Sequence, residues 1–490
     1  RDGGRLLCQA PTGIGKSMSV LFPALKSMGN ESVGPIFYLT ARGTTRTAAE
    51  NALAILRDTE PELHLRSVTL TAKDKICLCE TRECTPEACP YANGYYARIK
   101  GALWDVLDVP CLTAETLQEY AERHTVCPFE LGLDSSLWSD VIIGDYNYLF
   151  DPVVHLVRFF ESAGDYIFLV DEAHNLPGRA REMHSAALTK TSFYEAKKLL
   201  GKGKSSLKNA LTKVNDVFIE WRHRAEEETA ARDGRFGKTF FLKERSEEFD
   251  HLLNRLCEPL EAWLDDHREP DETHTALLQL YFDVRAWLRV ADTFDDHFVL
   301  QITASGSEVR AAQLCLDPSA FLADSFALGR AAVLFSATLA PASYYKDLCG
   351  VPEARAVALR SPFPAGNQGL FCIGNVSTRY KDRDASLAIV AESLATMVRA
   401  RCGNYLAFFP SYAYMEQAYA QFKEHCPEIN CIKQENAMDE QQKAAFLAQF
   451  VPGPSQPLLG FAVMGGVFGE GVDLTGDRLI GVGIVGPGLP

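Results

Sequence analysis

A glycine-rich segment close to the start of the printed chain carries the residue types that bind phosphate. It lies between a short apolar run, residues 5–8, and the helical pattern of residues 18–28. Its residues are Ala10, Pro11, Thr12, Gly13, Ile14, Gly15, Lys16 and Ser17, with Ala10 in the place of the usual first glycine. In such a turn the backbone N–H groups surround the phosphates, the lysine reaches the β and γ oxygens and the serine hydroxyl ligates magnesium. We therefore expect ATP to bind along this segment, with Lys16 catalytic and Ser17 a magnesium ligand.

A second group of reactive side chains follows residues 166–170, a run that is apolar on both faces. Such runs are typical of central strands in parallel sheets. Asp171, Glu172 and His174 stand at its end. An acidic pair in this place is often only a helix cap, but after a phosphate loop it indicates phosphoryl transfer, which needs positioning and charge neutralisation. We expect all three residues to be catalytic, with Asp171 holding magnesium through water and Glu172 orienting and deprotonating the attacking water.

Cysteines concentrate in one part of the chain. Six of the fourteen fall between residues 77 and 127, and the other eight are scattered singly. The four candidates for one metal site, separated by six, four and 37 residues, are Cys77, Cys84, Cys89 and Cys127. Four thiolates are the usual ligands of a [4Fe-4S] cluster, and the C-x-x-C pairs of many zinc sites do not occur in this segment. Zinc stays open as an alternative, as does Cys79 in the place of Cys77, and Cys111 is also close in sequence.

The elements that must position these residues alternate between strand and helix patterns, as a parallel sheet requires. Strands are expected at residues 5–8, 36–39, 141–143, 166–170 and 332–335, and a second series at residues 405–409, 458–464 and 479–485. Apolar residues three or four apart predict long amphipathic helices between residues 188 and 295. The sequence therefore predicts an α/β protein with two parallel-sheet domains and a helical insertion in the first.

Size and charge set the remaining limits. A chain of 490 residues is expected to form three or four folding units. No apolar stretch of about 18 residues could cross a bilayer, and the printed start has no signal-peptide pattern, so we expect a cytoplasmic protein. The net charge of −15 disfavours nucleic-acid binding as a property of the whole surface, although local basic patches could override it.

Further motifs complete a resemblance to the superfamily 2 helicases and translocases. Ser336, Ala337 and Thr338 follow the strand at residues 332–335, and residues 408–412 and 468–473 resemble motifs IV and V. A proline and an aromatic residue follow both Cys89 and Cys127, which resembles the iron-sulfur domain of the XPD/DinG family of DNA helicases. The resemblance covers nearly all of the chain.

This resemblance implies two RecA-like motor domains that close on ATP and Mg²⁺, and a [4Fe-4S] cluster on the four cysteines. It implies that Ser336, Ala337 and Thr338 couple hydrolysis to movement and that Glu470 and Asp473 contribute to ATP binding. Because open α/β sheets bind ligands at the carboxyl ends of their strands, the candidate DNA contacts are Thr40, Arg42, Tyr146 and Asn147.

The expected function is that of an ATP-dependent DNA helicase. By resemblance it would be a monomeric motor that moves 5′ to 3′ on single-stranded DNA and unwinds forked duplexes, in DNA repair or replication. Two alternatives remain open. One is an RNA helicase or translocase of the DEAH kind, which would lack iron and prefer RNA. The other is a non-hydrolysing, redox-sensing nucleic-acid-binding module, against which the complete set Lys16, Asp171 and Glu172 argues.

The expected domains follow the motifs. Motor domain 1 comprises residues 1–71, 136–185 and 301–360, the iron-sulfur domain residues 72–135, the helical arch-like insertion residues 186–300, and an incomplete motor domain 2 residues 361–490. The family's glutamine-containing adenine-reading segment and its glutamine-glycine-arginine motif VI are not found in the printed sequence. We therefore expect a piece of a longer motor, cut at both ends, that alone hydrolyses ATP slowly, since motif VI supplies an arginine that stabilises the transition state.

Overall fold

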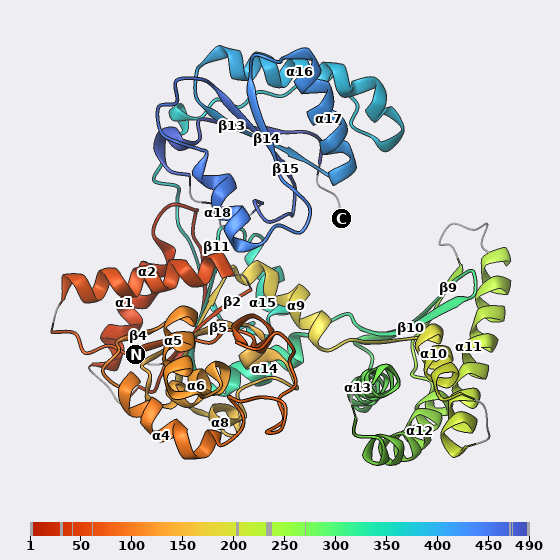
Figure 1. Ribbon diagram of the computed structural model, residues 1–490. Helices are drawn as coiled ribbons and strands as arrows, with labels where there is room; N and C mark the ends of the chain where they lie inside the picture. The colour runs from red at the N-terminus through yellow and green to blue at the C-terminus, as the bar shows by residue number, and fades with distance from the viewer. Residues whose placement is uncertain are drawn as a thin grey trace. The chain divides into compact units, whose positions relative to one another are not determined.

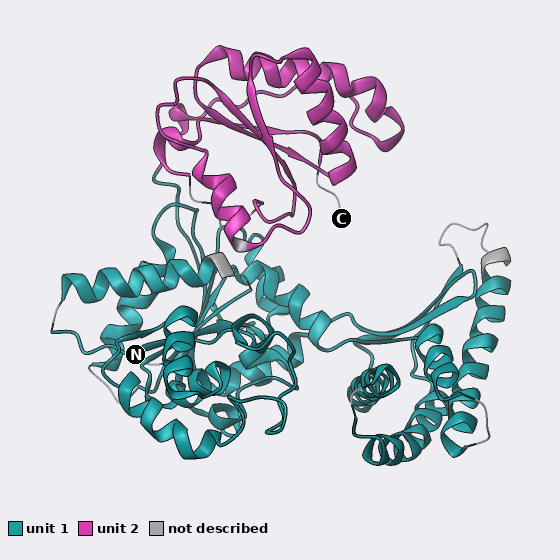
Figure 2. Cartoon of the chain, viewed as in Figure 1, with its two compact units in different colours: residues 1–362 teal, residues 363–490 magenta. Residues whose placement is uncertain are grey.

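Two compact units make up the chain, residues 1–362 (unit 1) and residues 363–490 (unit 2), which Figure 2 distinguishes by colour. The computed structural model describes residues 3–29, 33–41, 43–60, 62–201, 205–231, 238–269, 271–469, 472 and 474–487. The boundary between the units falls next to Pro362 and Pro364. Among the described helices, none is both long and apolar enough to cross a membrane.

Unit 1 is built on an eight-stranded sheet, sheet A, in which every pairing is parallel. Its strands, in spatial order, are β12 (Arg355–Ala358), β1 (Gly4–Gln9), β11 (Gly329–Ser336), β6 (Gly164–Asp171), β2 (Ile36–Thr40), β5 (Val141–Asp145), β3 (Ser67–Thr69) and β4 (Cys111–Leu112). Parallel strands need crossover connections, which here are mostly helical. This confirms the predicted α/β class.

Helices cover both faces of sheet A (Figure 1). One face packs against α1 (Lys16–Met28) and α2 (Gly43–Thr59). The other packs against a larger set: α4 (Tyr95–Val106), α5 (Ala114–His124), α6 (Pro128–Ser135), α7 (Asn147–Phe150), α8 (Val157–Phe160), α9 (Leu176–Met183) and α14 (Ser319–Ala327). The short helices α3 (Lys73–Ile76) and α15 (Ala342–Leu348) complete unit 1 outside the insertion described below. Residues 95–135 therefore share the hydrophobic core of the motor sheet.

Strand β2 shows how the two faces arise from the sequence. Successive side chains of a strand point to opposite faces. Accordingly Ile36 and Tyr38 join the cluster formed with α1 and α2, while Phe37 and Leu39 join the opposite cluster. All five residues of the strand are buried, as expected for a strand inside a parallel sheet.

The insertion, residues 186–315, has its own core. Its helices are α10 (Lys190–Leu199), α11 (Ser206–Ala231), α12 (Glu247–Asp266) and α13 (Glu272–Thr293), and they pack on sheet B, an antiparallel sheet. The strands of sheet B, in spatial order, are β7 (Ala186–Thr189), β10 (Glu308–Cys315), β9 (Phe298–Ser305) and β8 (Lys238–Leu242).

The sequence predicted the helices of this insertion but not its sheet. In β9, buried and partly buried residues alternate, a pattern with period two rather than the helical period. The β9–β10 hairpin joins β7 and β8 in sheet B rather than the motor sheet, so the insertion runs beyond residue 300, where we expected motor domain 1 to resume.

Unit 2 contains a four-stranded parallel sheet, sheet C. Its strands, in spatial order, are β14 (Asn430–Lys433), β15 (Leu458–Val463), β13 (Asn404–Phe409) and β16 (Gly481–Ile484). Its helices are α16 (Arg383–Ala400), α17 (Tyr412–His425) and α18 (Glu440–Ala448). The strands expected at residues 405–409, 458–464 and 479–485 correspond to β13, β15 and β16.

Candidate active site

The register of sheet A brings the predicted phosphate and acidic motifs to one edge. Gln9 at the end of β1 pairs with Ser336 at the end of β11, and Phe335 of β11 pairs with Asp171 of β6. Strand β11 thus lies between the strand that leads into the phosphate loop and the strand that ends in the acidic pair. Because the strands are parallel, their carboxyl ends form a single site, as in other open α/β sheets.

The phosphate loop has the local geometry that an anion requires. Gly13 and Gly15 have φ angles of +79° and +74°, in the left-handed region that glycine adopts without strain. Helix α1 begins at Lys16, directly after this turn, and neither a side-chain cap nor an acidic residue occupies its first turn. A helix N-terminus in this state attracts a negative group. The residues present therefore fit a bound phosphate chain.

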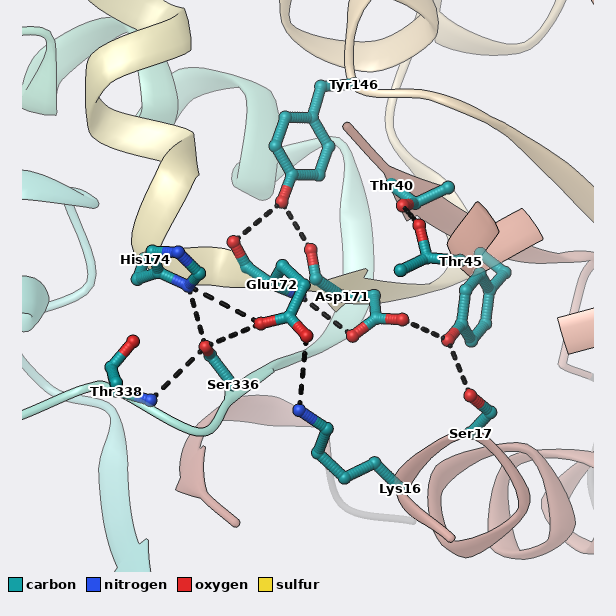
Figure 3. A network of polar contacts seen from close by, with 11 residues as sticks. Lys16, Ser17, Thr40, Thr45, Tyr146, Asp171, Glu172, His174, Ser336 and Thr338 are labelled. Carbon is teal, nitrogen blue, oxygen red and sulfur yellow. Dashed lines mark hydrogen bonds and ion pairs between the residues drawn. The ribbon is translucent and has the colours of Figure 1, made fainter. Parts of the chain in front are cut away.

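The acidic pair is tied to the phosphate loop by direct contacts, which Figure 3 shows from close by. Lys16 Nζ lies 3.3 Å from Glu172 Oε1. Ser336 donates its hydroxyl proton to Glu172 Oε2 at 2.9 Å, and His174 Nδ1 lies 2.7 Å from the same Ser336 oxygen. The predicted catalytic residues and the first of the predicted coupling residues therefore form one polar network.

Glu172 has an unusual backbone conformation, with φ 47° and ψ 44°. Non-glycine residues adopt this left-handed region at a cost in energy, and such residues cluster at functional sites. The buried Tyr146 hydroxyl donates to the backbone carbonyls of Asp171 and Glu172. These bonds hold the turn that aims the Glu172 carboxylate at Lys16.

Burial and neighbouring groups separate the pKa values of the two acids. Burial raises the pKa of Asp171 to about 6, although a hydrogen bond from Tyr38 acts in the opposite direction. Burial also acts to raise the pKa of Glu172, but the hydrogen bond with His174, the charge of Lys16 and the bond from Ser336 together lower it to about 2. Glu172 is therefore ionised in this arrangement, and its part in orienting and deprotonating water stays a prediction.

The donors around Asp171 fit Mg²⁺. Hydroxyl and carboxylate oxygens are the ligands this ion takes from proteins, together with waters and substrate phosphates. Ser17 and Asp171, the predicted magnesium residues, are both bonded to the Tyr38 phenol, at 3.1 and 2.6 Å. Sequence reasoning missed Tyr38, because a tyrosine inside an apolar strand has the pattern of a core residue.

The predicted DNA contacts lie at or near the same sheet edge, but their side chains differ in accessibility. Thr40 and Tyr146 are fully buried, and Thr40 bonds to the Thr45 hydroxyl. Asn147 is partly exposed and accepts a hydrogen bond from Arg179 at 3.3 Å. Arg42 lies outside the described residues. The structure thus gives Thr40 and Tyr146 internal bonds, and their contact with DNA stays a prediction.

Two arginines that sequence reasoning missed lie close to Asn147. Arg46 and Arg179 approach the Asp145 carboxylate to 3.5 and 3.9 Å. The Nε atoms of both arginines are buried and make no hydrogen bond to the described residues. No sequence signal marked them, because their common partner lies on a different element.

The other predicted ATP residues belong to the motif V segment of unit 2. Glu470 and Asp473 lie outside the described residues, whereas the preceding Phe468 is buried and stacks on Phe446 with ring centres 4.4 Å apart. In motif IV, the Tyr412 hydroxyl accepts a hydrogen bond from the buried Gln434 at 2.6 Å. The first of these contacts holds the segment that precedes Glu470.

The cysteine segment brings several thiols near one another. Cys79 Sγ lies 3.9 Å from Cys89 Sγ. Burial alone would lower the pKa of Lys73, but the charges of Cys84, Glu130 and Cys127 raise it, so two of the predicted ligands lie near one ammonium. Thiols in this number suit an iron-sulfur cluster or zinc by their chemistry. Within the described part of the chain, however, no three His, Cys, Asp or Glu side chains are gathered tightly enough to hold a metal ion.

Comparison with known proteins gives matches to helicases. Two family models match, DEAD_2 at residues 59–193 and the helicase C-terminal domain at residues 394–490. The ATP-dependent DNA helicase CHL1 of Coccidioides immitis is 21% identical over 77% of this chain and 49% of its own length. The general transcription and DNA repair factor IIH helicase subunit XPD of Schizosaccharomyces pombe is 23% identical over 64% of this chain and 49% of its own length. The chain thus spans about half the length of these relatives.

Solved structures agree on the fold. An XPD helicase superposes with a TM-score of 0.56 at 17% identity, covering 98% of this chain and 81% of the other. The Xpd4 protein of S. tokodaii gives a TM-score of 0.54 at 14% identity, covering 94% and 77%. These likenesses support the predicted pair of RecA-like domains. The two family models and the curated relatives show that the chain is similar to XPD-like helicases.

Proposed function

We propose that this chain is the motor of an ATP-dependent DNA helicase. The observation that carries the proposal is the single polar network in which Glu172 contacts both the phosphate-loop Lys16 and the β11 residue Ser336. A site that only bound nucleotide would have no need of a glutamate held between the lysine and a residue of a third strand. The name of one relative, the ATP-dependent DNA helicase CHL1, supports DNA as the substrate.

Each residue has a part in the proposed hydrolysis. The N–H groups of residues 13–17 and the Lys16 ammonium bind the phosphates, while Ser17 and Asp171 would hold Mg²⁺, which neutralises phosphate charge when bound. Phosphates compete with Glu172 for Lys16, so nucleotide binding frees one carboxylate oxygen of Glu172. The freed oxygen orients the attacking water, and Ser336 holds the other.

The finer parts of the proposal come from the family. We propose that the motor moves 5′ to 3′ on single-stranded DNA as a monomer, unwinds forked duplexes, and works in DNA repair or replication. Asn147, Arg42 and the arginines beside Asp145 are the proposed contacts for the DNA backbone, because phosphate contacts need basic and amide groups. The thiolates of Cys77, Cys84, Cys89 and Cys127 would hold a [4Fe-4S] cluster. Such a cluster would cross-link the cysteine segment.

The test is ATP hydrolysis by the chain with no nucleic acid, with single-stranded DNA and with single-stranded RNA, followed by unwinding of duplexes that carry a 5′ or a 3′ tail. Stimulation by DNA and unwinding from the 5′ tail are expected. Stimulation by RNA alone would favour the DEAH-type RNA helicase, and binding without hydrolysis under any condition would favour the non-hydrolysing module. Glu172→Gln is the control that separates this site from a contaminating ATPase.

A further inference from the structure

The Tyr38 side chain lies between the first turn of α1 and the end of β6. Tyr38 is the third residue of β2 and is fully buried, and it points to the face of sheet A that α1 covers. Ser17 stands in the first turn of α1, and Asp171 ends β6, the strand next to β2. The phenol oxygen therefore reaches both predicted magnesium residues, at 3.1 Å from Ser17 Oγ and 2.6 Å from Asp171 Oδ2.

The direction of these two bonds can be deduced. A phenol has one proton, and Tyr38 donates it to the Asp171 carboxylate, which has no proton of its own to give when ionised. The Ser17 hydroxyl must then be the donor in its bond with Tyr38. A serine hydroxyl has one proton and two lone pairs. With the proton directed at Tyr38, the lone pairs of Ser17 remain available to a cation.

We infer that Tyr38 is a positioning residue of the magnesium site, which turns the Ser17 lone pairs toward the metal and fixes Asp171 Oδ2 by a hydrogen bond. The inference rests on the proposed function, since it assigns a partner to the two proposed magnesium residues. A phenylalanine in this place would leave the Ser17 proton without this acceptor and Asp171 Oδ2 without this donor. A group that hydrogen-bonds to a metal ligand and orients it usually contributes about 10- to 100-fold to metal affinity.

The experiment measures the affinity of the chain for a fluorescent ADP analogue over a series of Mg²⁺ concentrations. The variants are Tyr38→Phe and, as a matched control, Tyr166→Phe in β6 of the same sheet, which removes a phenol that donates to the Phe159 carbonyl of α8. Without Mg²⁺, we expect the wild type and both variants to bind ADP with equal affinity. The half-saturating Mg²⁺ concentration should rise on the order of 10- to 100-fold in Tyr38→Phe and stay unchanged in Tyr166→Phe. An unchanged Mg²⁺ dependence in folded Tyr38→Phe would overturn the inference.

Two results separate this inference from the proposed function. If the wild-type chain binds no nucleotide, or binds it without help from Mg²⁺, the proposed function fails first. If Tyr38→Phe does not fold, 3-fluorotyrosine placed at position 38 alone keeps the phenol and reports on it. Its ¹⁹F resonance is expected to shift when Mg²⁺ is added to the ADP-bound chain, and a resonance that does not respond would overturn the inference.

Discussion

Lys16 Nζ and Glu172 Oε1 lie 3.3 Å apart, and both side chains are largely shielded from solvent. This ion pair joins the loop after β1 to the end of β6, on either side of β11. In the proposed function a nucleotide phosphate would draw on the same ammonium. The phosphate loop and the Glu172 carboxylate would then compete for one cation.

Replacing Lys16 with alanine should weaken ATP and ADP binding by at least about tenfold, because the charge-assisted bonds to the phosphates are lost. Binding is checked by titration with a fluorescent nucleotide. Lys26→Ala, an exposed lysine at the other end of α1, is the matched control and should bind normally. Equal losses in both variants would contradict a specific role for Lys16.

Glu172→Gln should have opposite effects on binding and hydrolysis. Nucleotide affinity should rise a few-fold, because Lys16 no longer has an anionic competitor, whereas hydrolysis should fall by about 10² to 10⁴. Equilibrium binding and single-turnover hydrolysis measure the two separately. Glu182→Gln, an exposed glutamate of α9, should change neither. A fall in nucleotide affinity on Glu172→Gln would contradict the proposed competition.

Ser336→Ala should separate hydrolysis from its stimulation by DNA. The substitution removes the hydrogen bond to Glu172 Oε2 and with it one cause of the low Glu172 pKa. We expect nucleotide binding to stay within about twofold, since the lost hydrogen bond joins a hydroxyl to the Glu172 carboxylate and does not involve the phosphates, while stimulation by single-stranded DNA falls. Hydrolysis is measured with and without DNA. Ser325→Ala in α14, whose hydroxyl donates to the Phe321 carbonyl of the same helix, is the control.

The affinity of the ADP-bound chain for Mg²⁺ should fall at low pH. The pKa of Asp171 is raised to about 6, so protons displace the metal below that pH, by about tenfold for each pH unit. A raised native pKa also means that this carboxyl lowers the free energy of unfolding as pH rises from about 4 to about 6. Affinity is measured between pH 5 and 7, and Asp171→Asn corrects for titration of the nucleotide itself. Identical pH profiles for wild type and variant would contradict a magnesium role for Asp171.

Protein purified without oxygen should be coloured if the cysteine segment holds a cluster. A broad band near about 400 nm, with iron and sulfide in equal amounts, is the expected signature of a thiolate-bound [4Fe-4S] cluster. The band should disappear in Cys89→Ser and persist in Cys402→Ser, an exposed cysteine of unit 2. Colourless protein that contains zinc would replace the cluster with a zinc site and leave the nucleotide predictions standing.

The sequence was most informative for short motifs whose residues follow one another along the chain. The phosphate loop, Asp171 and Glu172 could be recognised because strand, turn and helix patterns surround them, and the sheet brings them together. Tyr38 and Arg179 could not be recognised in this way, because each meets an acidic partner, Asp171 or Asp145, that lies far away in the sequence. The strands of sheet B were missed for a related reason, since β7 and β8 are short and pair with segments far along the chain.

Strand β1, which leads into the phosphate loop, lies between β11 and β12, the last two strands before the chain passes into unit 2. Residues 6–9 pair in parallel with residues 355–358, and Leu359 N donates to the Gln9 carbonyl at 2.9 Å. The connection to unit 2 therefore leaves unit 1 from a strand that is hydrogen-bonded along its length to the strand that leads into the phosphate loop.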